Sequence, residues 1–364
     1  MNGTKFRKLA VDPTNNCEAC SVFDVNNDGV MDIVCGEYWY QGPDFRTRHK
    51  ICDIPMVGEY RSDFSDYPMD VNGDGWMDII TSSWFCNGIY WRENPGNEGG
   101  EWKTHQIIEC GNCETIRYFD IDGCGTVEIF PNNPGEPAFF LKLIKDAQGK
   151  GTGKFEKYVI GEQNAGHGMG FGDIDGDGKV ELILNEGILH MPQAGPLAGL
   201  WTFSAEFTME KGPSVPILAH DVNKDGLMDI IVGAGHGFGL YWYEQGKDEN
   251  GKRTWKRHTI DEGWSQYHDM QMADIDGDGE LELVTGKRWK AHCGGDPGDA
   301  DPVFICYYKI LKDGLFSRHM IEFGDAEQGY SGVGIYFWLH DLTGNGKLDL
   351  AAPGKEGLYV FFNE

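Results

Sequence analysis

One short pattern recurs seven times along the chain and constrains its fold more than any other feature. It reads Asp, any residue, Asp, Asn or Thr, any two residues, Gly, any two residues, Asp or Glu, and an apolar residue. The copies begin at residues 24, 70, 120, 173, 221, 274 and 341. A spacing of roughly 50 residues, with an apolar β-branched run after each copy, is typical of propeller blades and not of helical solenoids. The sequence therefore predicts an all-β fold, a seven-bladed β-propeller.

These copies, here called acidic loops one to seven in chain order, have the composition of cation-binding turns. Oxygen-bearing side chains stand at positions 1, 3, 5 and 9, and the glycine at position 6 permits a sharp turn. Position 12 is Cys35, Thr81 or another strand residue where an EF-hand would need glutamate. An EF-hand is therefore excluded.

Five of the seven acidic loops have complete oxygen sets, and calcium is the structural cofactor expected there. Loop three has Cys124 at position 5, and loop seven has Thr343 and Asn345 in place of acids, so we expect a weak and a doubtful site. The expected calcium ligands are Asp24, Asn26, Asp28, Asp32, Asp70, Asn72, Asp74, Asp78, Asp173, Asp175, Asp177, Glu181, Asp221, Asn223, Asp225, Asp229, Asp274, Asp276, Asp278 and Glu282.

The charge balance narrows the possible partners. Lys and Arg number 31 against 58 Asp and Glu, which gives a formal net charge of −27. Nucleic acids and anionic membranes attract cationic surfaces, so neither is a predicted partner. The ten cysteines are too sparse for a disulfide framework. Unpaired thiols and the lack of an apolar leader predict a cytoplasmic location, or a secreted or periplasmic one if a leader has been removed.

The two ends of the chain predict how the ring closes. Segments such as WKTHQII and WKRHTI pair an aromatic residue with a later isoleucine and resemble the outer strand of a blade. The chain ends on GLYVFFNE with no such strand after it, whereas FRKLAV near the start fits that slot. We therefore expect residues 5–12 to complete the last blade of a single domain spanning 1–364.

A fixed offset before each acidic loop predicts a functional site in the channel. Residues six positions before the opening Asp should share one height around the ring. They include Glu18, Glu114, His167 and His268, and Tyr267 lies beside the last. The following strand returns to the same mouth, and longer insertions add further polar groups. The residues expected there are Trp84, His236, Lys287, Arg288 and, on an insertion, His292.

Together, the seven repeats resemble the FG-GAP/VCBS family of seven-bladed propellers across essentially the whole chain. The segments GHGMGFGDIDGDG, QYHDMQMADIDGDG and ELVTGKRWKAH are similar to the propeller of the aldos-2-ulose dehydratases, and more loosely to the propeller polysaccharide lyases. The resemblance implies that His167 is a proton-transferring base and that His268 and Tyr267 are its acid partners. It also implies that Glu114, His236, Lys287 and Arg288 hold substrate or a metal. The cupin domains of that dehydratase have no counterpart here.

These residues favour a carbohydrate-active lyase or dehydratase that performs β-elimination on a keto-sugar, glycoside or uronide. Imidazoles, carboxylates and cations without an activated nucleophile suit proton abstraction beside a carbonyl. One alternative is a non-catalytic propeller that binds glycan or protein. Another is a metal-dependent isomerase or hydrolase in which Zn or Mn is held by Glu18, Glu114, His167 and His268.

Overall fold

The fold is all-β. The computed structural model describes residues 4–209 and 212–364, which contain thirty strands and four short 3-10 helices. Within these ranges there is no α-helix, and thus no helix long and apolar enough to cross a membrane. The predicted domain 1–364 includes residues 1–3 and 210–211, which lie outside the described residues. The 3-10 helices are η1 (Gly96–Glu98), η2 (Ala291–Cys293), η3 (Lys312–Gly314) and η4 (Ala326–Gln328).

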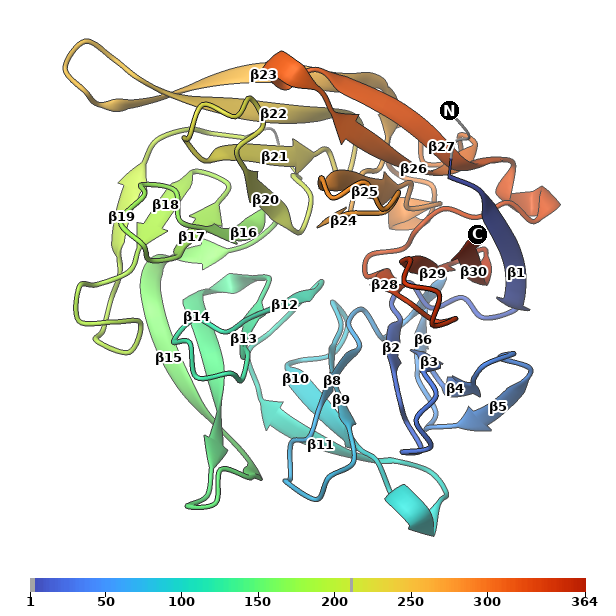
Figure 1. Ribbon diagram of the computed structural model, residues 1–364. Helices are drawn as coiled ribbons and strands as arrows, with labels where there is room; N and C mark the ends of the chain where they lie inside the picture. The colour runs from blue at the N-terminus through green and yellow to red at the C-terminus, as the bar shows by residue number, and fades with distance from the viewer. Residues whose placement is uncertain (1–3, 210–211) are drawn as a thin grey trace.

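The strands form curled sheets arranged in a propeller-like ring (Figure 1). The first comprises β2 (Ser21–Phe23), β3 (Asp32–Cys35), β4 (Tyr38–Gln41) and β5 (Thr47–Lys50). The second comprises β8 (Tyr67–Met69), β9 (Asp78–Ser82), β10 (Ile89–Glu93) and β11 (Lys103–Ile108). The third comprises β12 (Ile116–Phe119), β13 (Glu128–Pro131), β14 (Asn133–Lys145) and β15 (Gly151–Ala165).

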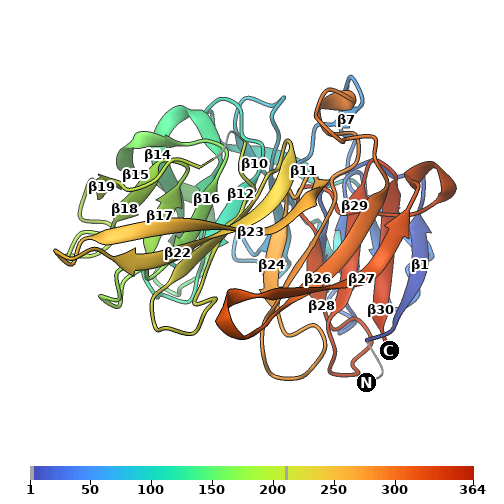
Figure 2. The ribbon, with the colours of Figure 1, turned by 90° about the horizontal axis from the view of Figure 1, so that it is seen from above.

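An eight-stranded sheet follows, in which β16 and β20 pair in parallel while the other neighbours are antiparallel. It comprises β16 (Met169–Gly172), β17 (Glu181–Leu184), β18 (Gly187–His190), β19 (Thr202–Ala205), β20 (Ile217–His220), β21 (Asp229–Gly233), β22 (Phe238–Lys247) and β23 (Arg253–Ser265). The next sheet comprises β24 (Met270–Ala273), β25 (Glu282–Gly286), β26 (Val303–Ile310) and β27 (Phe316–Gly324). A short hairpin, β6 (Met56–Val57) with β7 (Tyr60–Arg61), lies at one end of the ring (Figure 2).

The last sheet joins the two ends of the chain. It comprises β28 (Trp338–His340), β29 (Asp349–Gly354), β30 (Gly357–Asn363) and β1 (Phe6–Asp12). β1 runs antiparallel to β30, with Phe6 opposite Asn363 and Ala10 opposite Tyr359. This pairing covers the backbone edge that β30 would otherwise expose.

Each acidic loop connects the first two strands of its repeat through the same hydrogen bonds. The opening Asp accepts a bond from the backbone N–H of the position-6 glycine in all seven loops, at 2.8–3.1 Å. That glycine always has a positive φ, which other residues rarely adopt. The position-9 acid begins the second strand, and its carboxylate accepts from the N–H of the loop's second residue at 2.7–3.0 Å. Positions 1, 6 and 9 of the repeat therefore shape the turn.

Candidate functional site

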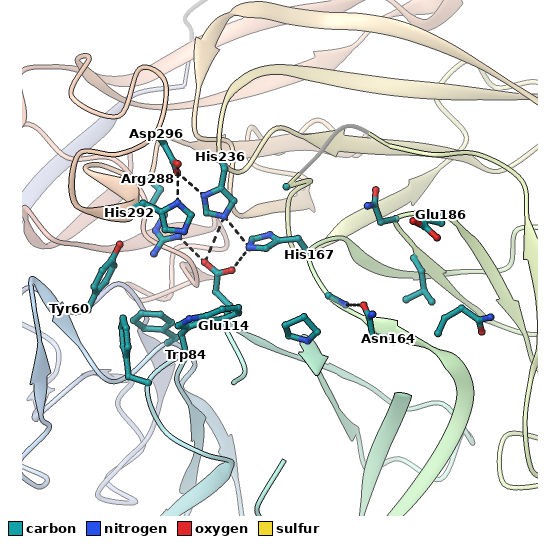
Figure 3. A pocket seen from close by; sticks show the side chains of 18 of the residues that line it. Tyr60, Trp84, Glu114, Asn164, His167, Glu186, His236, Arg288, His292 and Asp296 are labelled. Atoms are coloured by element: carbon teal, nitrogen blue, oxygen red, sulfur yellow. Dashed lines mark hydrogen bonds and ion pairs between the residues drawn. The ribbon is translucent and has the colours of Figure 1, made fainter. Parts of the chain in front are cut away.

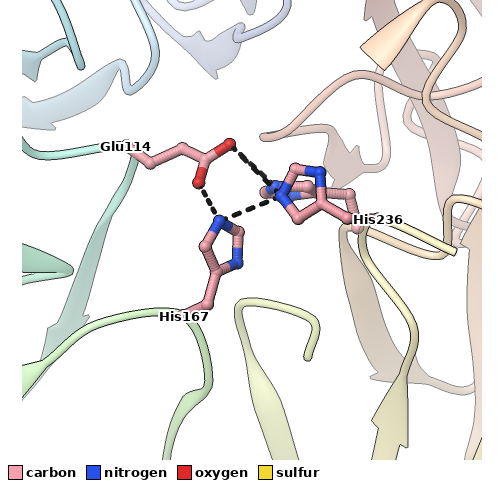
Figure 4. Close-up of side chains that lie close together, drawn as sticks. Glu114, His167 and His236 are labelled. Carbon is pink, nitrogen blue, oxygen red and sulfur yellow. Dashed lines mark hydrogen bonds and ion pairs between the residues drawn. The ribbon is translucent and has the colours of Figure 1, made fainter. Parts of the chain in front are cut away.

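A carboxylate and three imidazoles meet at one mouth of the ring. Glu114, His167 and His268 each stand two residues before the inner strands β12, β16 and β24, and His236 lies in the turn between β21 and β22. One ligand atom from each of the four lies within 4.8 Å of all the others. Figure 4 shows the side chains of Glu114, His167 and His236 pointing toward one another. We call these four residues the Glu–His cluster.

Within the Glu–His cluster, one nitrogen or oxygen atom of each side chain lies close to those of the other three. Nε2 of His236 lies 3.0 Å from Nε2 of His167 and 3.9 Å from Oε1 of Glu114. Nε2 of His268 lies 3.1 Å from Oε1 of Glu114, and Nε2 of His167 pairs with Oε2 of the same carboxylate. Four potential ligand atoms therefore face a common point.

The hydrogen-bond partners of Nδ1 in His167 and His236 show which ring nitrogen of each histidine carries a proton. Nδ1 of His167 lies 3.1 Å from the carbonyl oxygen of Pro213, and Nδ1 of His236 lies 2.8 Å from Oδ2 of Asp296. Both partners accept hydrogen bonds, so each Nδ1 carries a proton and, in the neutral ring, each Nε2 carries a lone pair. Two lone pairs cannot face each other at 3.0 Å unless a cation, either a proton or a metal ion, lies between them.

The pKa values at the site favour neutral His236 and His268 beside an ionised Glu114, whereas they favour the charged form of His167. Burial lowers the pKa of His268 to about 4 and that of His236 to about 3. Burial also acts to lower the pKa of His167, but the Glu114 carboxylate outweighs it and raises that pKa. Burial opposes ionisation of Glu114, yet His167 and His268 hold its pKa well below the usual range. Neutral imidazole and ionised carboxylate are the forms that bind metals.

Arg288 fixes the orientation of the carboxylate. Its Nη1 donates to Oε1 of Glu114 at 2.9 Å, and its Nε donates to Oε1 of Glu18 at 2.8 Å. All three side chains are buried. The guanidinium occupies Oε1 of Glu114, so Oε2 is the oxygen left to face His167.

A cavity of about 990 Å³ opens beside the Glu–His cluster (Figure 3). Figure 3 shows Tyr60 and Trp84 on one side of the cluster, and Asn164 and Glu186 on the other. One wall is aromatic and the other bears amides and a carboxylate. The aromatic wall comprises Tyr60, Phe64, Trp84 and Phe85, a further aromatic residue, Phe203, also lines the cavity, and the polar residues include Gln163, Asn164, Asn185 and Glu186.

The loop after β25 contributes a histidine and an aspartate that lie above the cluster. The ring of His292 stacks on that of His236, with centroids 4.3 Å apart and an interplanar angle of 8°. Nδ1 of His292 donates to Oδ1 of Asp296 at 2.9 Å, while Oδ2 accepts from His236. Sequence reasoning included His292 but missed Asp296, because an acid within an irregular insertion has no repeat offset to mark it.

Three predicted site residues take other roles. Tyr267 is fully buried, and its hydroxyl lies 2.9 Å from that of Tyr308, so it cannot serve as an acid to a substrate in the cavity. Lys287 is also buried, and its Nζ donates to Ser265 Oγ at 3.1 Å. Glu18 pairs with Arg288 behind the cluster and does not line the cavity. The substrate-binding roles of Lys287 and Glu18, and the catalytic role of Tyr267, are therefore not supported.

Comparisons with known proteins agree with the fold and say nothing of the site. Residues 221–285 match the FG-GAP-like repeat family, a segment that includes acidic loops five and six. A crystal structure of BBS1N in complex with ARL6DN, soaked with lead, aligns with a TM-score of 0.53 at 13% identity, covering 99% of this chain and 97% of that chain. The mercury-soaked form of that complex gives a TM-score of 0.55 at 12% identity, covering 98% and 96%. No curated protein matches the sequence. At such identities the likeness concerns the propeller-like fold alone.

Proposed function

We propose that the protein is a metal-dependent carbon–oxygen lyase that eliminates water or an alcohol from a keto-sugar, glycoside or uronide. One observation carries the proposal: the Nε2 atoms of His167 and His236 face each other at 3.0 Å while both Nδ1 atoms donate elsewhere. A divalent cation beside Glu114 and His268 resolves that conflict.

The donor set fits a transition metal of the Zn or Mn class. Three imidazoles and one carboxylate suit these ions, and calcium prefers oxygen ligands. His167 and His236 also have the backbone carbonyl and carboxylate partners that usually orient metal-bound histidines. Bound there, the metal would act as a Lewis acid that polarises a substrate carbonyl or carboxylate.

The chain itself supplies a base next to that centre. Asp296 accepts the Nδ1–H of His292, which leaves Nε2 of His292 as a lone pair in an imidazole whose side chain is 57% exposed at the cavity. In the proposed elimination this nitrogen removes the proton beside the carbonyl, the C–O bond breaks as the C=C bond forms, and the proton returns to the leaving oxygen. His167, expected from sequence to be the base, points its Nε2 into the Glu–His cluster and suits a ligand better.

The walls of the cavity support a sugar as substrate. Pyranose C–H faces pack on aromatic rings, and hydroxyls bond to amides and carboxylates. The aromatic wall with Trp84 and the polar wall with Asn164 and Glu186 offer both kinds of contact.

The proposal is tested by supplying the zinc-loaded protein with keto-sugars, glycosides and uronides. Elimination forms a C=C bond conjugated to a carbonyl or carboxylate, so ultraviolet absorbance should rise with time. Binding without any product would support the glycan-binding alternative. Product without a new chromophore would support a metal-dependent isomerase or hydrolase.

Trp84 is expected to contribute mainly to substrate binding. Trp84→Ala should raise KM by about tenfold and change kcat little, since stacking contributes about 1.5 kcal/mol and each 1.36 kcal/mol is tenfold. Steady-state kinetics measure both constants. Phe323→Ala is the matched control, because this exposed aromatic side chain does not line the cavity. An unchanged KM for Trp84→Ala would show that the aromatic wall does not bind the substrate.

Asp296 is expected to act as a positioning residue for His236. Asp296→Asn should weaken zinc affinity by about 10- to 100-fold, because the group that holds a metal-bound imidazole in place contributes that much. Competition with a chromophoric chelator measures the affinity. Asp301→Asn, an exposed change in the same loop, should leave it unaltered. Equal affinities for both variants would contradict the role.

Two finer features of the fold belong to the same proposal. We take the sheets as seven blades, with the eight-stranded sheet counted as two blades joined by the β16–β20 pairing. We also retain calcium as the ion of acidic loops one, two, four and five.

A further inference from the structure

In two acidic loops, a lysine from the third strand of the sheet places its ammonium among the carboxylates. In loop three, Nζ of Lys142 on β14 lies 2.6 Å from Oδ2 of Asp122 and 2.6 Å from Oε1 of Glu128, at positions 3 and 9. In loop six, Nζ of Lys309 on β26 lies 2.6 Å from Oδ2 of Asp278, contacts Asp276, and lies 4.0 Å from Glu282. These oxygens stand at positions 5, 3 and 9.

The residue at position 3 of these acidic loops differs with the charge of the side chain that faces it from the third strand of the sheet. Loops three and six have Asp at position 3 and a lysine facing it. Loop four also has Asp there, and Nδ1 of His190 lies 3.4 Å from Asp175. Loops two and five instead have Asn at position 3, and each amide donates to a third-strand glutamate at 3.3 Å. Those pairs are Asn72 with Glu93 and Asn223 with Glu244.

We propose that the lysine of the neighbouring strand takes the place of calcium in acidic loops three and six, so that these loops bind no divalent ion. In loop six, backbone N–H groups donate to Asp274 at position 1, to Oδ1 of Asp278 at position 5 and to Oε2 of Glu282 at position 9, and the oxygens that remain for a cation include Oδ2 at positions 3 and 5. In loop six both of those oxygens contact Lys309. The inference stands apart from the proposed function, since both lysines lie outside the Glu–His cluster.

Electrostatic repulsion prevents calcium and the lysine ammonium from occupying the same loop together. Calcium needs six to eight oxygens at about 2.3–2.6 Å, so it would share its carboxylates with an ammonium only a few ångströms away. The sequence expectation of calcium at Asp274, Asp276, Asp278 and Glu282 rests on their complete oxygen set, and the proposal places the ammonium of Lys309 there instead. Loop three, where Cys124 already predicted a weak site, has the same arrangement.

The test counts calcium bound to the full chain. Lys309→Gln removes the ammonium, and the double variant Asp276→Asn with Lys309→Glu copies the Asn–Glu arrangement of loops two and five. After chelation and resaturation with calcium, each variant should bind one more calcium ion than the wild type. Without calcium, Lys309→Gln should melt below the wild type, and it should regain stability as calcium is added.

Lys224→Gln is the matched control. Lys224 is exposed and pairs with Glu280, whose side chain stands at position 7 of loop six outside the cation-binding oxygens. Its calcium count and its melting temperature in chelator should equal those of the wild type. A wild type that binds as many calcium ions as Lys309→Gln and the double variant would overturn the proposal. So would a Lys309→Gln protein whose melting temperature in chelator matches the wild type.

Discussion

Replacing His236 with alanine is expected to release the metal from the Glu–His cluster and to lower kcat by roughly a thousandfold, since Lewis-acid activation supplies several kcal/mol of barrier lowering. His236 is the residue whose Nε2 faces His167 and whose Nδ1 is held by Asp296. Its loss removes one of four ligand atoms and opens the centre to water. Zinc content by atomic emission and initial rates on the best substrate measure the two effects together.

Two further variants separate metal binding from proton transfer. His292→Gln should retain zinc and lose about a hundredfold or more in kcat, because it removes a base and no ligand. His258→Ala should change neither quantity, since that imidazole stacks on Trp242 with centroids 4.4 Å apart, on an outer strand. Full activity in a zinc-free His236→Ala protein would refute a metal-dependent reaction. Full activity in His292→Gln would assign the base elsewhere.

The second large effect concerns stability. Arg288→Met should lower the free energy of unfolding by about 3–5 kcal/mol, because it leaves two buried carboxylates without their shared cation. Glu18 and Glu114 both bond to this guanidinium, and the three side chains are no more than 6% exposed. Denaturant titration followed by tryptophan fluorescence measures the change.

Arg7→Met serves as the comparison for that experiment. Arg7 pairs with Glu364 on the surface, where both side chains are substantially exposed. An exposed pair contributes about 0–1 kcal/mol, so this variant should unfold near the wild-type midpoint. Equal losses for the two arginines would mean that the buried pair contributes no more than a surface one.

Much of the fold could be predicted from the repeat because the repeat is a folding requirement. The opening Asp, the glycine and the position-9 acid each make a hydrogen bond that forms the turn or starts the next strand, so they recur wherever the turn recurs. The side chains at positions 3 and 5 add oxygens of the kind that bind calcium. Lys309, the residue that we propose to decide cation binding in the sixth loop, stands on the third strand outside the repeat, so the repeat alone does not indicate it.

The site was predicted in part, for a reason that lies in strand geometry. Equal offsets before the acidic loops brought Glu114, His167 and His268 together, since equivalent residues of neighbouring sheets share one height. Tyr267 failed because adjacent residues of an extended chain point to opposite sides, so its ring enters the core while His268 faces the cluster. The same alternation separates Lys287 from Arg288. The position of Asp296 depends on the path of an irregular loop, and the periodic pattern of the sequence does not encode that path.

The pairing of β1 with β30 also affects the order in which the strands fold. Arg7 lies opposite Phe362, so this contact joins residues at nearly the greatest separation that the described chain allows. Contacts between distant residues form late because a long loop must close first. β1 therefore has no sheet partner until β30 has been synthesised and has folded against it.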